Sequence, residues 1–185
     1  FRSIDNEEYF QRKSVFGNND ESFFKDNDER AIFFCRGVLE TVKKLGWTPD
    51  VVHCHGWMTS LVPMYLKKAF NSDPIYADSK VVYSVYNNPF EGELNSDLSQ
   101  KMLVDGVNEN DVEIVNNPTF NNLNKLGIQF ADGVIMAEEN INSEISEFAK
   151  NMDLPILEYK NEDDYIDACS EFYDEILTQE GVLVE

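Results

Sequence analysis

Two short segments of the chain combine residue types that could bind a sugar. They are His53-Cys54-His55-Gly56-Trp57 and Tyr86-Asn87-Asn88-Pro89-Phe90-Glu91-Gly92. Imidazole and amide groups can hydrogen-bond to sugar hydroxyls, the rings of Trp57 and Phe90 offer stacking faces, and glycines permit close approach. The composition of both segments is typical of ligand-binding loops.

The only two histidines, His53 and His55, are two residues apart, so a strand would place both side chains on one face of a sheet. Three interpretations stay open: structural hydrogen bonding, contact with a sugar, and a zinc site, for which no third ligand has a fixed place nearby. We favour His55 as the sugar-binding residue because it lies nearer the strand end, and we expect neither a metal nor a cofactor. Trp57 could equally be a core residue.

Other kinds of catalytic site have little support in the sequence. Glu91 and Glu93 could be taken for an acid/base pair, but solvated charges are expected on loops of so acidic a chain. There is no Gly-x-Gly-x-x-Gly or Walker sequence and no serine in a nucleophile elbow. Ordinary dinucleotide binding and acyl transfer are therefore not expected.

The candidate residues follow segments that the pattern predicts to be strands. Short β-branched runs at 50–55, 80–86 and 133–136 alternate with helical patterns, and such alternation predicts a mainly parallel sheet. We therefore predict a single Rossmann-like α/β/α domain over 1–185, in which ligands collect at the carboxyl ends of the strands. Residues 5–25 are expected to form a long surface loop, and helices are expected at 26–45, 60–70, 97–104, 118–130, 141–150 and 163–177, the last closing the domain.

Charge and cysteine content restrict the partners and the compartment. The chain has 35 acidic and 15 basic residues, a net charge of −20, so nucleic acid is not an expected partner, and a diphosphate would need helix N-termini or locally placed bases. Cys35, Cys54 and Cys169 are widely spaced, as expected for reduced thiols in the cytoplasm. No apolar run approaches the roughly 18 residues of a membrane span. Because the chain starts at Phe1 without a methionine, we expect residues to precede it.

Three longer segments resemble the N-terminal domain of glycogen and starch synthases. They are 5–12 (DNEEYFQR), 26–36 (DNDERAIFFCR) and 47–63 (WTPDVVHCHGWMTSLVP), and a looser similarity continues through 81–92 and 131–145. The resemblance covers about residues 4–145. It implies one half of a two-domain (GT-B type) retaining glycosyltransferase, which transfers glucose from ADP-glucose or UDP-glucose to an α-1,4-glucan in the cleft between its domains.

The resemblance also implies roles for individual residues. It places His55 beside the transferred sugar, Trp57 at a matching tryptophan, Asn87 at a matching asparagine, and Tyr9 in a Tyr-Phe loop near the cleft. The chain departs from the family pattern elsewhere: Gly56 replaces an Asp, and Met58 and Tyr86 each replace a His, while Ala137-Glu138 replaces a Ser-Pro pair.

The glycine-rich loop that holds the diphosphate in the family, and the second domain, lie outside the chain. The expected function is therefore a glucosyltransferase domain that is inactive alone and needs a second domain or partner chain. The alternative is an inert glucan-binding or regulatory relative.

Overall fold

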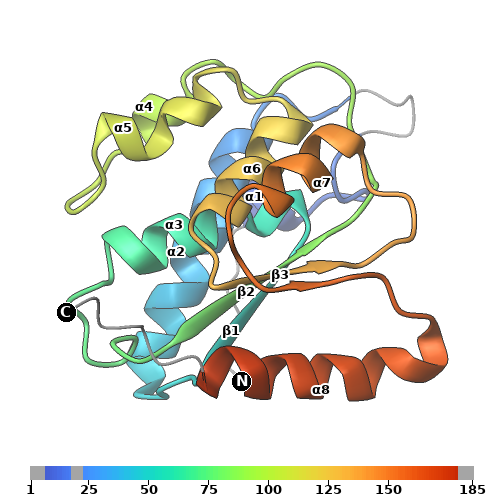
Figure 1. Ribbon diagram of the computed structural model, residues 1–185. Coiled ribbons are helices and arrows are strands. Elements are labelled where there is room, and N and C mark those ends of the chain that lie inside the picture. Colours follow the sequence, from blue (N-terminus) through green and yellow to red (C-terminus); the bar gives the residue numbers. More distant parts are fainter. Residues whose placement is uncertain (1–6, 18–22, 179–185) are drawn as a thin grey trace.

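The centre of the computed structural model, which describes residues 7–17 and 23–178, is a parallel four-stranded sheet (Figure 1). Its strands are β1 (Val51–His55), β2 (Lys80–Val85), β3 (Gly133–Met136) and β4 (Ile156–Leu157), in the order β1-β2-β3-β4. The three longer strands are those that the β-branched runs predict, and their parallel pairing confirms the α/β fold. The two-residue strand β4 was not predicted.

Helices cover both faces of the sheet and make three layers. The helices α2 (Asn27–Leu45), α3 (Leu61–Lys68), α6 (Phe120–Gln129) and α7 (Ser143–Lys150) lie on one side, and α8 (Glu162–Thr178) lies alone on the other (Figure 1). Because α3, α6 and α7 each connect neighbouring parallel strands, the carboxyl ends of all strands meet at one edge. This edge is where the fold can hold a ligand.

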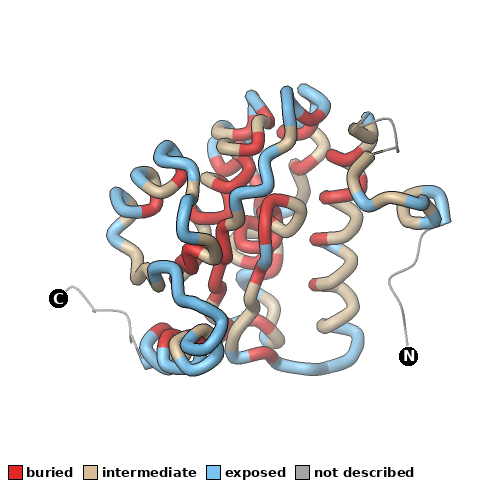
Figure 2. Tube along the Cα trace, turned by 90° about the vertical axis from the view of Figure 1, so that its right-hand side faces the viewer, coloured by how far each residue is buried: buried red, intermediate tan, exposed pale blue. Residues whose placement is uncertain are grey.

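Buried side chains form two clusters, one on each side of the sheet. The larger lies between the sheet and the helices α2, α3 and α6, and it includes the fully buried Tyr65 and Tyr83. The smaller lies under α8 and consists of Val82, Ile135, Cys169, Phe172 and Ile176. In Figure 2 the buried residues gather in the middle of the molecule, and the outer turns are exposed. All three cysteines are buried and free.

Helix α2 closely matches the predicted bounds, and it begins without a side-chain cap. Gly46 takes a left-handed conformation with φ of 65°, and its N–H donates to the carbonyl oxygen of Lys43, as glycine at a helix end commonly does. At the start, the side chain of Asp26 makes no capping hydrogen bond. It accepts instead from both terminal nitrogens of Arg12, at 2.8 and 2.5 Å. A hydrogen bond between a guanidinium and a carboxylate is stronger than the bond that a backbone N–H would donate to the same carboxylate.

Two segments differ from the predictions. The expected loop 5–25 contains a one-turn helix α1 (Glu7–Phe10) and a bridge between Gly17 and Phe23, while residues 5, 6 and 18–22 lie outside the described part. Phe16 and Phe23 of this segment pack against the core, which the prediction of a surface loop did not include.

The helix expected at 97–104 is only one turn, α4 (Leu98–Lys101). It is followed by α5 (Glu109–Val112) and the 3₁₀ turn η2 (Glu113–Asn116); another 3₁₀ turn, η1 (Trp57–Thr59), follows β1. Within the described ranges, no helix is both long and apolar enough to cross a membrane.

Candidate functional site at the carboxyl edge of the sheet

The end of β1 holds two histidine rings against each other. The ring centroids of His53 and His55 are 3.9 Å apart with a tilt of 34°. Both lie on the α8 side of the sheet, because the side-chain direction of a strand repeats every second residue. The shared face predicted from their spacing is confirmed.

His53 is held by two hydroxyl groups. Its Nδ1 lies 2.6 Å from the hydroxyl oxygen of Tyr173 in α8, and its Nε2 lies 2.7 Å from Oγ of Ser84 in β2. A neutral imidazole has one donor and one acceptor nitrogen, and hydroxyls can serve both. Burial, followed by the neighbouring His55, lowers the pKa of His53 to about 4. His53 is therefore an uncharged structural residue at neutral pH.

His55 is the exposed member of the pair. Its Nδ1 lies 2.9 Å from the hydroxyl oxygen of Tyr86, just beyond β2. Burial of part of the ring lowers the pKa of His55, so this side chain also is neutral near pH 7. Among the described residues no hydrogen bond to its Nε2 is formed, which leaves that nitrogen for a ligand.

Gly56 and Tyr86, two of the departures from the family pattern, are neighbours. Gly56 has φ of 72°, a conformation that side chains rarely adopt, and a Cβ atom there would lie 3.7 Å from Cδ2 of Tyr86. The N–H of Gly56 donates to the carbonyl oxygen of Ser84 at 3.0 Å. The replacement of an Asp by Gly56 and of a His by Tyr86 therefore belong to one local arrangement around His55.

Trp57 is a core residue in this structure. Its side chain is only 2% exposed, and its ring centroid lies 5.0 Å from those of Phe16 and Phe90 and 5.9 Å from that of Phe23. The ring of Phe90 in turn stacks on that of Phe23 at 4.8 Å. The buried ring of Trp57 therefore presents no free face at this edge, and the partly buried ring of Phe90 has Phe23 stacked on one face.

Asn87 lies at the same edge as His55. It is exposed and follows Tyr86 directly, and the register of the sheet sets His55 opposite Ser84. The ends of β1 and β2 therefore bring an imidazole and an amide to the same edge of the sheet, and both groups can hydrogen-bond to hydroxyls.

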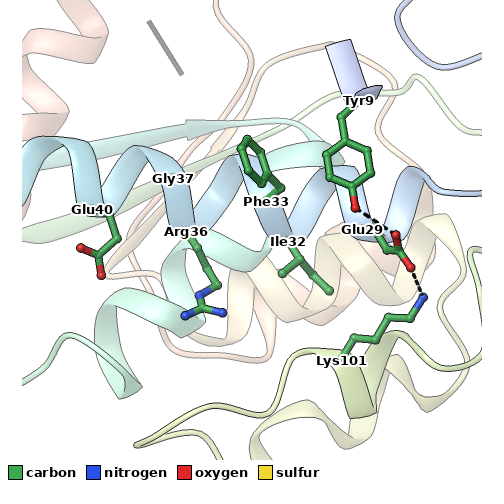
Figure 3. A pocket seen from close by; sticks show the side chains of 8 residues that line it. All are labelled: Tyr9, Glu29, Ile32, Phe33, Arg36, Gly37, Glu40 and Lys101. Atoms are coloured by element: carbon green, nitrogen blue, oxygen red, sulfur yellow. Dashed lines mark hydrogen bonds and ion pairs between the residues drawn. The ribbon is translucent and has the colours of Figure 1, made fainter. Parts of the chain in front are cut away.

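Tyr9 lies in a different place, a cavity of about 550 Å³ beside α2 (Figure 3). Its hydroxyl donates to Glu29 at 3.0 Å, and Lys101 from α4 donates to the other oxygen of that carboxylate at 2.8 Å. The accepting carboxylate raises the pKa of Tyr9. The cavity has the lining residues Tyr9, Glu29, Ile32, Phe33, Arg36, Gly37, Glu40 and Lys101. Tyr9 therefore does not share a cavity with His55, Trp57 or Asn87.

The charged side chains that follow β1, β2 and β3 are all negative. The connections after β1, β2 and β3, residues 56–60, 86–97 and 137–142, contain no Lys or Arg but carry five carboxylates, Glu91, Glu93, Asp97, Glu138 and Glu139. Across residues 7–17 and 23–178, no group of three or more His, Cys, Asp and Glu side chains could hold a metal ion. The edge can accommodate neutral hydroxyl-rich ligands better than it can a diphosphate.

Comparison with known proteins identifies the family. The family profile described as starch synthase catalytic domain matches residues 1–156 of the chain. The chain belongs to the starch synthase catalytic domain family. This membership and the parallel sheet confirm the resemblance and the GT-B-like fold predicted from the sequence.

Relatives within the starch synthase family are longer proteins. The chain is 31% identical over 155 residues to a glycogen synthase of Clostridium perfringens, covering 81% of this chain and 30% of that protein. It is 41% identical over 103 residues to a glycogen synthase of Chlorobium limicola, covering 55% and 21%. The chain thus spans less than a third of the length of these relatives.

A solved starch synthase structure supports the same fold. The catalytic domain of starch synthase IV from Arabidopsis thaliana, bound to ADP and acarbose, superposes with a TM-score of 0.61 at 17% identity, covering 83% of this chain and 32% of that one. At 17% sequence identity, this structural similarity supports a shared fold and nothing finer.

In this starch synthase family domain, sequence analysis missed the hydroxyl residues around the histidines. Tyr173 fits the apolar pattern of the closing helix, and Ser84 lies in a β-branched run, so both would be read as packing residues. The only signal was that each carries a hydroxyl on a face otherwise expected to be apolar, and a buried hydroxyl requires a partner. The sugar-binding roles of His55, Trp57, Asn87 and Tyr9 stay predictions.

Proposed function

We propose that this chain is one wall of a glucosyltransferase cleft and that its part in the reaction is to bind α-1,4-glucan through His55 and Asn87. The observation that supports this proposal is the exposed, neutral His55, held by Tyr86 at the carboxyl edge with a nitrogen available to a ligand. Asn87 is exposed at the same edge. Neutral donors and acceptors suit sugar hydroxyls, which carry no charge.

Transfer of glucose from a nucleotide sugar needs more than this edge contains. The departing diphosphate must be stabilised by positive groups in a cleft that excludes water, whereas the only charged side chains in the connections after β1, β2 and β3 are carboxylates. We propose that a second domain or a partner chain supplies those groups. ADP-glucose is the proposed donor, and ADP in the Arabidopsis starch synthase structure supports that choice. The buried free cysteines fit the reducing cytoplasm, which is the proposed location.

Calorimetric titration with maltoheptaose and, separately, ADP-glucose tests the proposal. We expect maltoheptaose to bind, ADP-glucose to give no heat, and His55→Ala and Asn87→Ala each to weaken maltoheptaose binding about three- to tenfold, the value of one hydrogen bond. Asn88→Ala is the matched control, because Asn88 is also exposed beside Asn87, and its affinity should equal that of the unchanged chain. Equal affinity in all the variants would overturn the proposal.

An inert glucan-binding or regulatory role is the second candidate. It is favoured by the contact between Gly56 and Tyr86, which replace family residues on both sides of His55. The two candidates differ in one measurement, the incorporation of labelled glucose from ADP-glucose into glycogen when the chain is supplied with the nucleotide-binding domain of a related synthase. Incorporation that depends on His55 supports the transferase; glucan binding without incorporation supports the regulatory role.

A further inference from the structure

The tyrosines that contact the histidine pair come from two different parts of the fold. Tyr86 follows β2, and Tyr173 lies in α8, beyond the residues 1–156 that match the family. Each hydroxyl contacts the Nδ1 atom of its histidine, at 2.9 Å for His55 and 2.6 Å for His53. The two contacts therefore have the same chemistry on neighbouring rings.

The direction of each hydrogen bond follows from the acidity of the groups. A phenol O–H, with an ordinary pKa near 10, is a better donor than the N–H of a neutral imidazole, and the imidazole nitrogen is the better acceptor. The tautomer of a histidine is set by the hydrogen bond that its other nitrogen makes. A hydroxyl that donates to Nδ1 therefore places the ring proton on Nε2.

We propose that Tyr86 is a positioning residue that fixes His55 as the Nε2–H tautomer, so that this N–H donates to a glucan hydroxyl. Tyr173 fixes the same tautomer of His53, whose ring lies against the ring of His55. The identity of the ligand in this inference depends on the proposed function. The assignment of the tautomers does not.

The surroundings of His53 are consistent with that direction. Once Tyr173 donates to Nδ1, the Nε2–H of His53 can donate to Oγ of the fully buried Ser84, which lies 2.7 Å away. Both nitrogens of the half-buried ring are then satisfied. The ring of His53 is held by α8 on one side and by β2 on the other. Its centroid lies 3.9 Å from that of His55, so that it also restricts the His55 ring.

The protonation states agree with this geometry. Burial raises the pKa of Tyr86 and that of Tyr173 and lowers that of both histidines. All four side chains are therefore uncharged near neutral pH, each tyrosine keeping the proton that it donates. Helix α8 thus belongs to the site, although it contributes no residue that contacts the ligand.

The proposal is tested by long-range ¹H–¹⁵N correlation spectra of the chain labelled with [¹⁵N]histidine, which distinguish the two neutral tautomers. We expect both histidines of the unchanged chain to carry the proton on Nε2. Tyr86→Phe should shift His55 toward a mixture of tautomers and raise its pKa, because the donated bond that favours the neutral ring is lost. A His55 that carries its proton on Nδ1, or whose pKa falls in Tyr86→Phe, would overturn the inference.

Two further variants separate positioning from general packing. Tyr173→Phe should alter the nitrogen shifts of His53 first. Tyr165→Phe, also half-buried in α8, should change both rings much less, because Tyr165 has no hydrogen bond to either histidine and interacts instead with Cys169 and the two tyrosines. Changes of equal size in both variants would contradict a specific role for Tyr173. If Tyr173→Phe does not fold, the tautomer of His53 in the unchanged chain tests the role of Tyr173. A proton on Nδ1 of His53 would contradict that role.

The consequence for binding is measured separately. Tyr86→Phe should weaken maltoheptaose binding about three- to tenfold, and adding it to His55→Ala should cause no further loss, because Tyr86 acts through His55. Independent losses would contradict the positioning role. If the unchanged chain shows no maltoheptaose binding while the tautomers are as expected, the proposed function fails and the positioning of the histidines stands.

Discussion

At the scale of single residues, hydroxyl groups decide the state of the two histidines. His53 has Tyr173 and Ser84 on its two nitrogens and His55 against its face. Each of these neighbours is uncharged, so nothing around the ring compensates a positive charge, and burial disfavours the protonated form. The fold therefore favours the neutral imidazole of His53 over its protonated form.

We predict that His53 makes the chain lose stability between about pH 6.5 and pH 4. The folded-state pKa is lowered to about 4, whereas the unfolded chain protonates near the ordinary value of about 6.5. The unfolded state therefore binds more protons in this window, so the contribution of His53 is complete above it and is lost as the pH falls. After allowance for the partial exposure of the ring, the loss in unfolding free energy is about 1 to 2 kcal/mol.

Urea unfolding of the unchanged chain and of His53→Gln at pH 7, 6 and 5 measures this contribution. Glutamine does not titrate but can still hydrogen-bond to a hydroxyl. The difference in unfolding free energy between the two chains should shrink as the pH falls. Parallel pH dependences in the two chains would show that His53 does not titrate in this window.

At the scale of elements, the approach of α6 to the sheet depends on one glycine. A Cβ atom at Gly127 would lie 2.7 Å from Cε2 and Cζ of Tyr83 in β2. That ring is fully buried and cannot turn freely, because its hydroxyl donates to Oδ1 of Asn124 at 2.9 Å. Asn124 in turn donates to the carbonyl oxygen of Phe120 at 2.8 Å. Helix and strand are therefore joined by a hydrogen-bonded contact that has no space for a methyl group.

We predict that Gly127→Ala destabilises the fold by about 1 to 3 kcal/mol, the usual effect of overpacking. Helix propensity alone would predict the opposite sign, a gain of up to about 1 kcal/mol. Gly37→Ala in α2 is the matched control, since Gly37 is also a helical glycine and it borders the cavity beside Tyr9. Thermal unfolding should therefore show a lower Tm for Gly127→Ala and an equal or higher Tm for Gly37→Ala. A higher Tm for Gly127→Ala would contradict the close contact between Gly127 and the ring of Tyr83.

At the scale of the whole molecule, the excess of acidic residues acts on stability. The described ion pairs use several of the 15 basic residues: Lys101 with Asp28 and Glu29, Lys68 with Asp111, and Lys67 with Asp132. Because 35 acidic residues are present, most carboxylates remain without a cation. Their mutual repulsion opposes the compact state.

We predict that sodium chloride stabilises the chain at pH 7. Screening at about 0.15 M shortens the range of electrostatic forces to about 8 Å, which weakens the repulsion between exposed carboxylates more than it weakens partly buried ion pairs. The Tm should therefore rise between low salt and physiological salt. The same series near pH 4.3, the pI calculated from the sequence, is the control and should show a much smaller rise. A Tm that falls with salt at pH 7 would mean that ion pairs dominate instead.

Local patterns in the sequence predicted the strands that carry the site. β-Branched runs predicted the three longer strands, and the alternation of strands and helices predicted a parallel sheet. The spacing of His53 and His55 was sufficient to put them on one face. These features are predictable because they depend on backbone periodicity and on turn residues within a few positions of each other.

The contacts between side chains depend on segments that are far apart in the sequence. Trp57 is covered by Phe16, Phe23 and Phe90, and His53 is bound by Tyr173, which lies 120 residues away in the sequence. No local pattern carries this information. The residues next to an aromatic residue in the sequence do not show whether remote segments cover its ring or leave it open to a ligand. Packing of distant segments therefore removed Trp57 from the edge and brought Tyr173 to it.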